Sequence, residues 1–406
     1  MIEIRLTGGA RGRGVEVKIG IYNQPLEGAI GGSEYCAAVL SEALSRSHDV
    51  EVIHHRAGLR KEGLGEFFAV DLSGIRLRYV PYKPYHYGHS RTPWRRVREA
   101  RSWQSDLSEP YDVFVNFTHD IPPFCRAPNG VLVVLFPAID VHQMWPWNGV
   151  GTDCSWLWRR MRVAYSDWEW KKRFASYSTK TAISRFSRDW ARRWWEVDCE
   201  VVYPPVTGCG PVVEPKTNSI LSVGRFTTSG HTKKQREMLV AFGSLKAAQS
   251  RGWQYHCIGG LSDVCEDQEY FHEVSHLATA SGARITANIE HRDLRRAYAQ
   301  AKIFWHATGY GEDDSHHPER QEHFGITTAE AMSAGCVPVV FNMGAQPEIV
   351  EHGASGFVWN TLEELQHYTM LLVRDGALHA KMSEAARQRA QIFSRESFVK
   401  RFLNLL

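Results

Sequence analysis

The sequence lacks three features that would assign it to common special classes of protein. No apolar run reaches the roughly 18 residues of a transmembrane helix, and no signal peptide is recognisable. The eight cysteines are scattered without a C-x-x-C pair, and the His-His pairs at 54–55 and 316–317 lack the spacing of a zinc site. The net charge is only +3, without a polybasic tail, so nothing favours nucleic acid as a partner. We therefore expect a cytoplasmic globular protein with no metal and no cofactor.

The chain is long enough for two ordinary domains. It has 406 residues, of which 43% are hydrophobic and 23% charged. The first half opens with the strand V-E-V-K-I-G-I-Y, the turn G-A-I-G-G-S-E-Y, the helix C-A-A-V-L-S-E-A-L and the strand H-D-V-E-V-I-H. This is a βαβ beginning. A Pro- and Gly-rich connection follows much later, and it places the hinge near Pro204–Lys216.

Alternating strands and helices continue on both sides of this hinge and predict an α/β fold with two doubly wound domains. Further strands of the first half are expected at Ile75–Val80, Tyr111–Phe117, Val131–Phe136, Thr179–Ser184 and Glu200–Tyr203. Those of the second half are expected at Ile220–Gly224, Gln254–Gly259, Arg284–Asn288 and Ile303–Ala307, with helices at Lys234–Gln249, Gln268–Ser281, Leu294–Ala301 and Leu378–Leu406. The loops after the second-half strands should converge on one crevice.

Two carboxylates eight positions apart mark the most informative segment, E-H-F-G-I-T-T-A-E, from Glu322 to Glu330. Gly325 would let the backbone approach a ligand, and Thr327 or Thr328 would cap a helix that starts there. The first N–H groups of that helix would face a diphosphate, and Glu330 in its first turn would accept hydrogen bonds from ribose hydroxyls. The alternative is that both acids are only solvated or match the helix dipole. Gly335, as a C-cap, and the buried strand V-P-V-V-F after it favour the site.

The run from Pro318 to Trp359 resembles the donor site of the family 4 retaining glycosyltransferases. The resemblance extends upstream to L-S-V-G-R-F-T-T-S-G-H-T-K-K-Q, where these enzymes carry an Arg and a Lys aimed at the donor diphosphate. Arg225 and Lys233 match these two positions. The spacing is longer than the family's G-R-x-x-x-x-K, so Lys234 remains an alternative, with a solvated helix-face charge as its other interpretation. Two cations and a helix N-terminus would stabilise the leaving diphosphate without a metal.

The resemblance implies a GT-B fold, in which two Rossmann-like domains face each other across a cleft. The acceptor-side domain would cover residues 1–205 and the donor domain residues 206–385, with a last helix, 386–406, crossing back. The implied reaction moves a hexose from a nucleoside-diphosphate sugar, of the UDP or GDP type, to an acceptor hydroxyl with retained configuration and no protein nucleophile. Catalytic residues would be Arg225, Lys233 and Glu322. Donor-binding residues would be Gly31, Gly32, Lys234, His323, Phe324, Gly325, Ile326, Thr327 and Glu330, with the base near Asn288 and His291.

The first half departs from the family at one position. Many family members carry a histidine after a central strand, but this chain has Leu135-Phe136-Pro137 there. His119, Asp120 and His142 are the nearest substitutes on the acceptor side, and each also fits a loop role. Gly31 and Gly32 match the family's Gly-Gly turn or form a plain tight turn. A dinucleotide-binding fold is weakly supported, because G-x-G-x-x-G spacing and a suitably placed acid are missing.

Tryptophan is frequent beside Arg and Lys between residues 94 and 195. Three interpretations stay open: a contact with the inner membrane face, a platform for an acceptor sugar, or simple burial in the core. The expected partners are a nucleotide sugar and an acceptor that is a glycan, a lipid-linked sugar or a small molecule. Other classes to separate are a non-catalytic nucleotide-sugar or glycan-binding protein and a GT-B phosphorylase.

Overall fold

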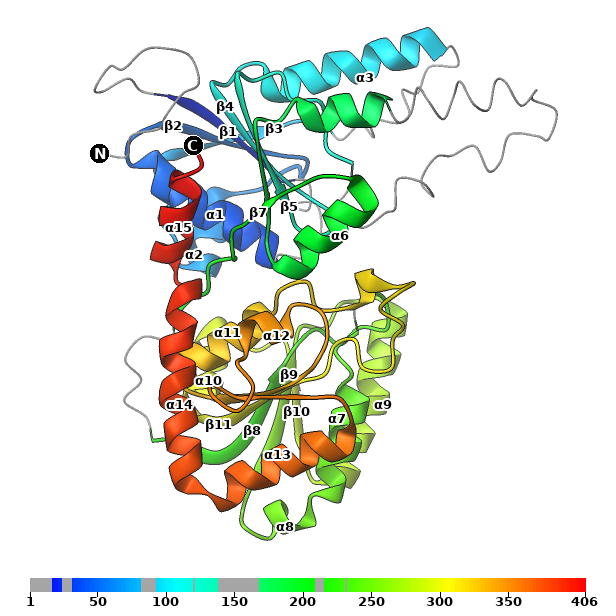
Figure 1. Ribbon diagram of the computed structural model, residues 1–406, viewed down its shortest axis with the longest axis vertical. Coiled ribbons are helices and arrows are strands. Elements are labelled where there is room, and N and C mark those ends of the chain that lie inside the picture. Colours follow the sequence, from blue (N-terminus) through cyan, green and yellow to red (C-terminus); the bar gives the residue numbers. More distant parts are fainter. Residues whose placement is uncertain are drawn as a thin grey trace, which may run out of the picture. The chain divides into compact units, whose positions relative to one another are not determined.

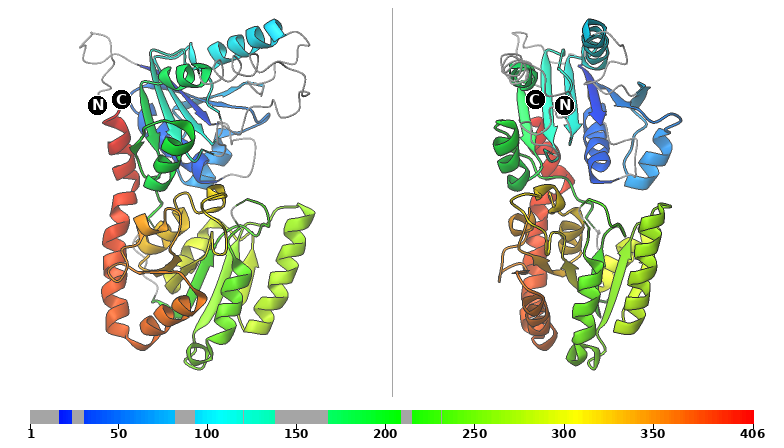
Figure 2. Two further views of the ribbon diagram at one scale, coloured as in Figure 1. Left: turned by 45° about the vertical axis from the view of Figure 1, so that its right-hand side comes forward. Right: turned by 90° about the vertical axis from the view of Figure 1, so that its right-hand side faces the viewer.

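A computed structural model describes residues 17–23, 31–81, 93–119, 121–137, 168–208, 215–230 and 232–406, without the side chains of 93–97. These residues divide into two compact units. The first unit comprises Met1–Tyr203 together with Phe398–Leu406, and the second comprises Pro204–Ser397. Figure 1 shows that each unit is built on its own twisted sheet, and Figure 2 shows helices on both faces of each sheet.

The sheet of the first unit has seven parallel strands in the order β3-β2-β1-β4-β5-β6-β7. The chain starts at β1, moves outward through β2 and β3, returns to the other side of β1 with β4, and moves outward again. The direction of winding therefore reverses between β1 and β4. The strands are β1 Lys18–Asn23, β2 Asp49–His54, β3 Ile75–Tyr79, β4 Val113–Thr118, β5 Asn129–Val134, β6 Thr179–Ala182 and β7 Glu200–Val201.

Aromatic side chains fill the core of the first unit. Gly20 in β1 is needed because a Cβ there would lie 2.5 Å from the ring of Tyr111. Trp170 and Trp195 are buried and contact each other, with ring centroids 5.8 Å apart. Trp103 and Trp190 are buried as well. The core interpretation of the tryptophans is thus correct for these four residues. Helices of this unit include α1 Gly32–Ser45, α2 Lys61–Phe68, α3 Pro93–Ser108 and α6 Arg185–Trp195, and residues 168–175 are helical as well.

The sheet of the second unit has six parallel strands in the order β10-β9-β8-β11-β12-β13. Strand residues alternate between two apolar clusters, as the period of two requires: Ile220 and Ile303 face one cluster, Leu221 and Phe304 the other. The first cluster is covered by α7 (Gln235–Ser244), α9 (Cys265–Ser281) and α13 (Leu362–Arg374), and the second by α10 (His291–Gln300) and α11 (Ile326–Ser333). The strands are β8 Thr217–Val223, β9 Gln254–Gly259, β10 Arg284–Ala287, β11 Ala301–His306, β12 Val337–Phe341 and β13 Phe357–Trp359.

Two helices of the second unit lie within three residues of their expected ranges, at 265–281 and 291–300, whereas two expected long helices differ and the helix at 362–374 was not predicted. The helix expected at 234–249 breaks at Leu245 into α7 and α8. The helix expected at 378–406 is α14, a short 3-10 turn and α15; α14 begins earlier, where the Asp375 side chain caps it by accepting from the N–H of Leu378. The helices are α7 Gln235–Ser244, α8 Lys246–Gln249, α9 Cys265–Ser281, α10 His291–Gln300, α11 Ile326–Ser333, α12 Gln346–Ile349, α13 Leu362–Arg374, α14 Gly376–Ala390 and α15 Arg395–Leu403.

The end of the chain belongs to the first unit in terms of contacts, since residues 398–406 group with it. There the Thr179 hydroxyl lies 3.5 Å from the carbonyl oxygen of Leu405. In the described ranges, no helix combines the length and the apolar character needed to cross a membrane.

Candidate donor site

The candidate site lies where the winding of the second unit changes direction. β8 and β11 are neighbours at the centre of the sheet, and the chain leaves them in opposite directions, to β9 and to β12. The loops after β8 and β11 therefore diverge. Ligands of open α/β sheets bind at such a point, beyond the carboxyl ends of the strands. Arg225 and Lys233 follow β8, and Glu322 follows β11.

Lys233 and Glu322 form an ion pair at this point. The Lys233 Nζ lies 2.6 Å from Glu322 Oε2, and the side chains are only 17% and 11% exposed. The Nε2 of His306, the last residue of β11, lies 2.9 Å from the same oxygen. Burial lowers the pKa of His306, Glu322 raises it and Lys233 lowers it, so the imidazole is neutral at pH 7. The structure thus brings together two of the three residues predicted to be catalytic.

Two glycines make this arrangement possible. A Cβ on Gly224 would lie 2.6 Å from the Cγ of Lys233, so the lysine stem rests directly on the backbone after β8. Gly344 has a φ of +61°, and a Cβ there would lie 2.4 Å from the Glu322 carbonyl oxygen. The same oxygen accepts a hydrogen bond from the N–H of Ala345, at 2.8 Å. The loop after β12 therefore fixes the backbone of Glu322, while Lys233 and His306 fix its side chain.

Gly325 begins the helix α11 as its N-cap, with a φ of +108°. No side chain caps this helix, so the prediction that Thr327 or Thr328 does so is wrong. Both threonines come after the cap, Thr327 half-buried and Thr328 fully buried in the helix. A Cβ on residue 325 would lie 2.3 Å from the side-chain nitrogen of Gln346. Glycine is therefore required twice over, by its dihedral angle and by its close neighbour.

Glu330 occupies the second turn of α11, not the first, because the helix starts at Ile326. Its Oε2 accepts a hydrogen bond from the hydroxyl of Tyr298, at 3.1 Å. Burial raises the pKa of Glu330 to about 7, against the lowering effects of Tyr298 and Arg295. The carboxyl is thus poised to change charge near neutrality. The helix ends at Ser333 with Ala334 as its C-cap, so the predicted C-cap, Gly335, lies one position beyond the observed cap and has a φ of +76°.

Lys234 is paired with a different carboxylate, in the loop after β11. Its Nζ lies 2.5 Å from Glu312 Oε1, and Arg320 lies 3.1 Å from the other oxygen. Hydrogen bonds from Lys234 and Arg320 lower the pKa of Glu312. Lys234 is therefore not a solvated helix-face charge. It is the N-cap residue of α7, with a φ of +55°.

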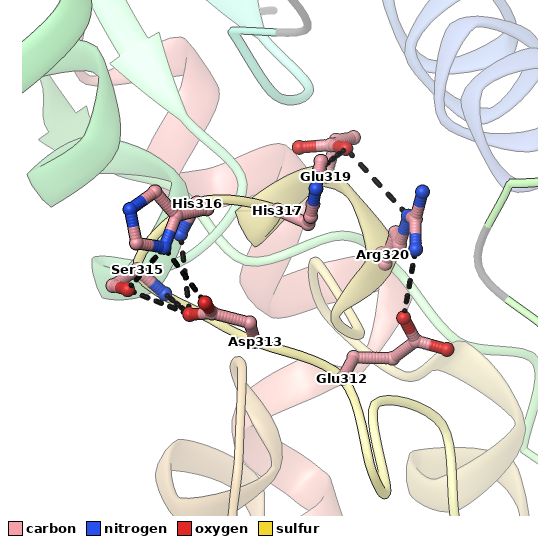
Figure 3. A network of polar contacts seen from close by, with 7 residues as sticks. All are labelled: Glu312, Asp313, Ser315, His316, His317, Glu319 and Arg320. Carbon is pink, nitrogen blue, oxygen red and sulfur yellow. Dashed lines mark hydrogen bonds and ion pairs between the residues drawn. The ribbon is translucent and has the colours of Figure 1, made fainter.

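The rest of this loop carries a second network, shown in Figure 3. Asp313 lies 2.7 Å from the ring of His316, and its pKa is held below the usual range chiefly by the hydroxyl of Ser315. His317 lies 3.1 Å from Glu319. These side chains are largely exposed. Solvent therefore screens the charges, and the pairs contribute little to the stability of the fold. In the described residues, no group of three or more His, Cys, Asp or Glu is arranged to hold a metal ion.

Arg225 is exposed two residues after β8; the pKa of Asp267 is lowered chiefly by the hydroxyl of Ser262, and the charge of Arg225 contributes in the same direction. The backbone at this place is held firmly. The Gln235 side chain donates to the carbonyl oxygen of Arg225 at 2.9 Å and accepts from the Tyr270 hydroxyl at 3.1 Å. The backbone of Arg225 is thus held in place, and the role of its exposed side chain stays a prediction.

The residues expected near the base lie at the next strand ends. Asn288 has a φ of +52°, and its amide makes two hydrogen bonds to the backbone of Leu261, at 2.8 and 3.0 Å. It therefore joins the loops after β9 and β10. His291 begins α10, and burial lowers its pKa. Neither observation tests a contact with a base.

The donor-loop residues beside Glu322 differ in accessibility. His323 and Ile326 are half-buried, whereas Phe324 is 3% exposed. The Phe324 ring packs edge-on against Phe393, with centroids 5.4 Å apart. Only the backbone of Phe324 is therefore in a position to serve a ligand.

The predicted residues of the first unit are only partly described. Gly31 is the N-cap of α1 and Gly32 its first residue, and the Glu34 carboxylate accepts from the N–H of Gly31 at 2.9 Å. His119 follows β4, and burial lowers its pKa to about 4, so it is a neutral loop residue at pH 7. Asp120 and His142 lie outside the described residues.

Sequence reasoning missed His306 and Glu312. His306 was included in an expected strand, where a histidine in an apolar run passes for a core residue. The feature that could have identified His306 as a site residue is its position as the last residue of a strand next to the reversal of winding. Glu312 lay in a loop to which no role was assigned, and only the fold shows that it reaches Lys234, 78 positions away.

Comparison with known proteins agrees with this geometry. Residues 211–389 match the family described as Glycosyl transferases group 1. This region holds the whole candidate site of the second unit, and together with the fold it supports a glycosyltransferase.

Two curated relatives share part of the sequence. GDP-Man:Man(3)GlcNAc(2)-PP-Dol alpha-1,2-mannosyltransferase of Dictyostelium discoideum is 25% identical over 235 residues, which is 54% of this chain and 44% of that protein. Poly(glycerol-phosphate) alpha-glucosyltransferase of Bacillus subtilis is 36% identical over 84 residues, 20% of this chain and 12% of that protein. The chain thus matches less than half the length of either relative.

Solved structures match almost the whole chain. A glycosyltransferase from Rickettsia africae has a TM-score of 0.64 and 15% identity, covering 96% of this chain and 97% of its own. HepE of Anabaena, in complex with UDP and glucose, has a TM-score of 0.63 and 16% identity, covering 96% and 99%. With two parallel α/β sheets in the chain, these similarities confirm the predicted GT-B fold class.

Proposed function

We propose that this protein is a retaining, metal-independent glycosyltransferase that moves a hexose from a nucleoside-diphosphate sugar to an acceptor hydroxyl. The observation that carries the proposal is the buried Lys233–Glu322 pair at the reversal of winding, beside the glycine that begins α11. Cations and helix N–H groups that face a departing diphosphate stabilise the charge that develops on it. A carboxylate beside them accepts hydrogen bonds from sugar hydroxyls and thereby orients the sugar.

In this mechanism the protein positions the partners and compensates charge, without a covalent intermediate. Lys233 and Arg225 meet the diphosphate, with Lys234 as the neighbouring cation. Glu322 orients the donor sugar. The leaving phosphate accepts the proton of the acceptor hydroxyl, so the protein needs no general base for this step.

Two donors are suggested by the names of similar proteins. One relative is a GDP-mannose-dependent mannosyltransferase by its name, and a structural neighbour holds UDP and glucose. We therefore give GDP-mannose and UDP-glucose first place among the donors to be tried. Neither relative assigns the acceptor.

Nucleotide binding is the first test. We expect GDP or UDP, and one of their hexose conjugates, to raise the melting temperature of the protein by several degrees. Lys233→Ala should abolish the shift, and Arg236→Ala should not, since Arg236 forms an exposed pair with Glu273. No shift with any nucleotide would contradict the proposal.

Product analysis separates the other classes. A non-catalytic binding protein would bind the sugar nucleotide and never release the nucleoside diphosphate. A phosphorylase would release a sugar phosphate from a glycan and inorganic phosphate. For a retaining transferase we expect nucleoside diphosphate and an α-linked product from an α-linked donor, identified by NMR of the anomeric proton.

A further inference from the structure

His306 is the residue at the site that the proposed mechanism does not yet use. It closes β11 at the reversal of winding, is 3% exposed, and points its Nε2 at Glu322 Oε2 over 2.9 Å. The hydroxyl of Thr308 lies 3.2 Å from the same nitrogen. The buried ring is in hydrogen-bond contact with the carboxylate that is predicted to orient the sugar, so packing alone does not account for a histidine at this position.

The chemistry of the contact fixes the proton of the ring. A carboxylate oxygen only accepts hydrogen bonds, so the proton must sit on Nε2, which donates it. Nδ1 is then an unprotonated nitrogen, and among the described residues it has no hydrogen-bond partner. The ring therefore makes its one strong polar contact with Glu322. The charged groups that influence it are Glu322 and Lys233.

Glu322 shares one oxygen between two donors, because Lys233 lies 2.6 Å and His306 2.9 Å from Oε2. A bound sugar nucleotide should affect these two hydrogen-bond donors differently. Lys233 is flexible and positively charged, so the diphosphate attracts it. His306 is held in a strand and is neutral. When a diphosphate draws Lys233 away, the histidine stays in place as a fixed donor to the carboxylate.

We propose that His306 is a positioning residue whose Nε2–H holds the Glu322 carboxylate toward the transferred sugar while Lys233 turns to the donor diphosphate. This inference rests on the proposed function. The histidine does not touch substrate; it acts through Glu322. Its loss should therefore affect the step that depends on the sugar, and leave binding of the nucleoside diphosphate nearly unchanged.

The test compares three variants of the full-length protein. His306→Phe keeps a ring and removes the donor, whereas His306→Gln places an amide N–H near the position of Nε2. We expect kcat to fall about 10- to 100-fold in the Phe variant, the range that a small misplacement of a reacting group produces. In the Gln variant kcat should stay within about threefold of the wild type. His306→Asn, whose amide is too short to reach Oε2, serves in place of the Phe variant if that protein does not fold.

Binding of GDP and UDP, measured by calorimetry, is the second readout. The dissociation constant of the nucleotide that the wild type binds should change less than about threefold in the Phe variant, because the cations remain. A double-mutant cycle gives the third: in a Glu322→Gln background, His306→Phe should have little further effect on kcat.

Each outcome decides between the two proposals. If the wild type binds no nucleotide, the proposed function fails and the inference fails with it. If the wild type transfers sugar and the Phe variant does so at the same rate, only the inference is overturned. The same holds if the Gln variant loses as much as the Phe variant, or if nucleotide and sugar steps decline together, since either result would indicate a packing role.

Discussion

The two units wind in the same way and use the point of reversal differently. In the second unit this edge of the sheet carries a charged pair, Lys233 and Glu322. The neutral, polar side chain of His306 lies beside them. In the first unit the buried Glu34 carboxylate accepts from the N–H of Gly31, and two other buried polar contacts of the described residues are between neutral groups. Tyr22 lies 2.7 Å from His55, and Asn116 donates to the hydroxyl of Tyr177 at 3.1 Å. The topology thus offers a place for a ligand in both units, and the side chains decide whether charge chemistry is possible there.

Removing Lys233 should have the largest effect, because it takes away the positive charge that distinguishes the second unit from the first. In Lys233→Ala the Glu322 carboxylate loses its cation while it stays almost buried, a loss that costs about 3 kcal/mol of unfolding free energy. The transfer rate should fall at least about 100-fold, since a charge that meets the leaving group is gone. Chemical denaturation and initial rates measure the two effects. Arg236→Ala, the exposed control, should change neither, and a stable, fully active Lys233→Ala would refute the charged edge.

Distorting the backbone that supports Glu322 should have the next largest effect. Gly344→Ala places a Cβ against the Glu322 carbonyl oxygen at a φ of +61°. The dihedral strain alone costs about 1–3 kcal/mol, and the collision adds to it. Gly353→Ala is a matched control, because its φ is +76° and nothing lies within 4 Å of the new Cβ. Equal losses of unfolding free energy in both variants would show that the contact with Glu322 is unimportant.

The titration of Glu330 should make the stability of the second unit depend on pH. Its pKa is raised in the folded state to about 7, so the folded protein holds a proton that the unfolded chain has released. The resulting stability is complete below about pH 4.5 and is lost as the pH rises through 7. We expect a loss of about 1–3 kcal/mol from pH 5 to pH 8 at this group. Glu330→Gln should remove that part of the pH dependence in urea denaturation curves, and an unaltered slope would argue against the raised pKa.

The smallest expected effect lies in the first unit. Tyr177→Phe removes the hydroxyl that accepts from Asn116 and donates to the carbonyl oxygen of Pro123, at 2.7 Å. The loss of unfolding free energy should be about 1–2 kcal/mol. Nucleotide affinity should not change, because Tyr177 precedes β6 and belongs to the apolar core of the first unit. Tyr79→Phe, at a ring that is 51% exposed, is the control and should be neutral. Weaker nucleotide binding in Tyr177→Phe would contradict the purely structural role that we assign to this contact.

Local sequence signals predicted much of the fold and part of the site. The strands β9, β10, β11 and β12 appear within two residues of their expected bounds, since buried parallel strands are short apolar runs between turn signals; β8 begins three residues earlier than expected, and β13 was not predicted. The glycine at 325 was predicted to let the chain approach a ligand, and it does begin α11. The threonine cap was wrong because the glycine itself takes the cap position. A cap is decided by backbone dihedral angles that sequence spacing leaves open.

What the sequence could not supply was the pairing of distant side chains. Glu312 and Glu322 each meet a lysine about 80 to 90 positions away, and the choice between Lys233 and Lys234 depends on which one lies against Gly224. Such contacts follow from the order of the strands. Local spacing places both lysines at the same loop and cannot distinguish them.

The close packing of Gly344 on Glu322 also says when the site can exist during synthesis. Glu322 needs Lys233 from the loop after β8 and Ala345 from the loop after β12, so more than a hundred residues must be made before its surroundings are complete. Parallel strands pair only after such long connections have closed. On the ribosome, a chain that has emerged only as far as α11 would therefore carry the carboxylate without its support. The candidate donor site is thus expected to form late in translation, when the strand β12 joins the sheet.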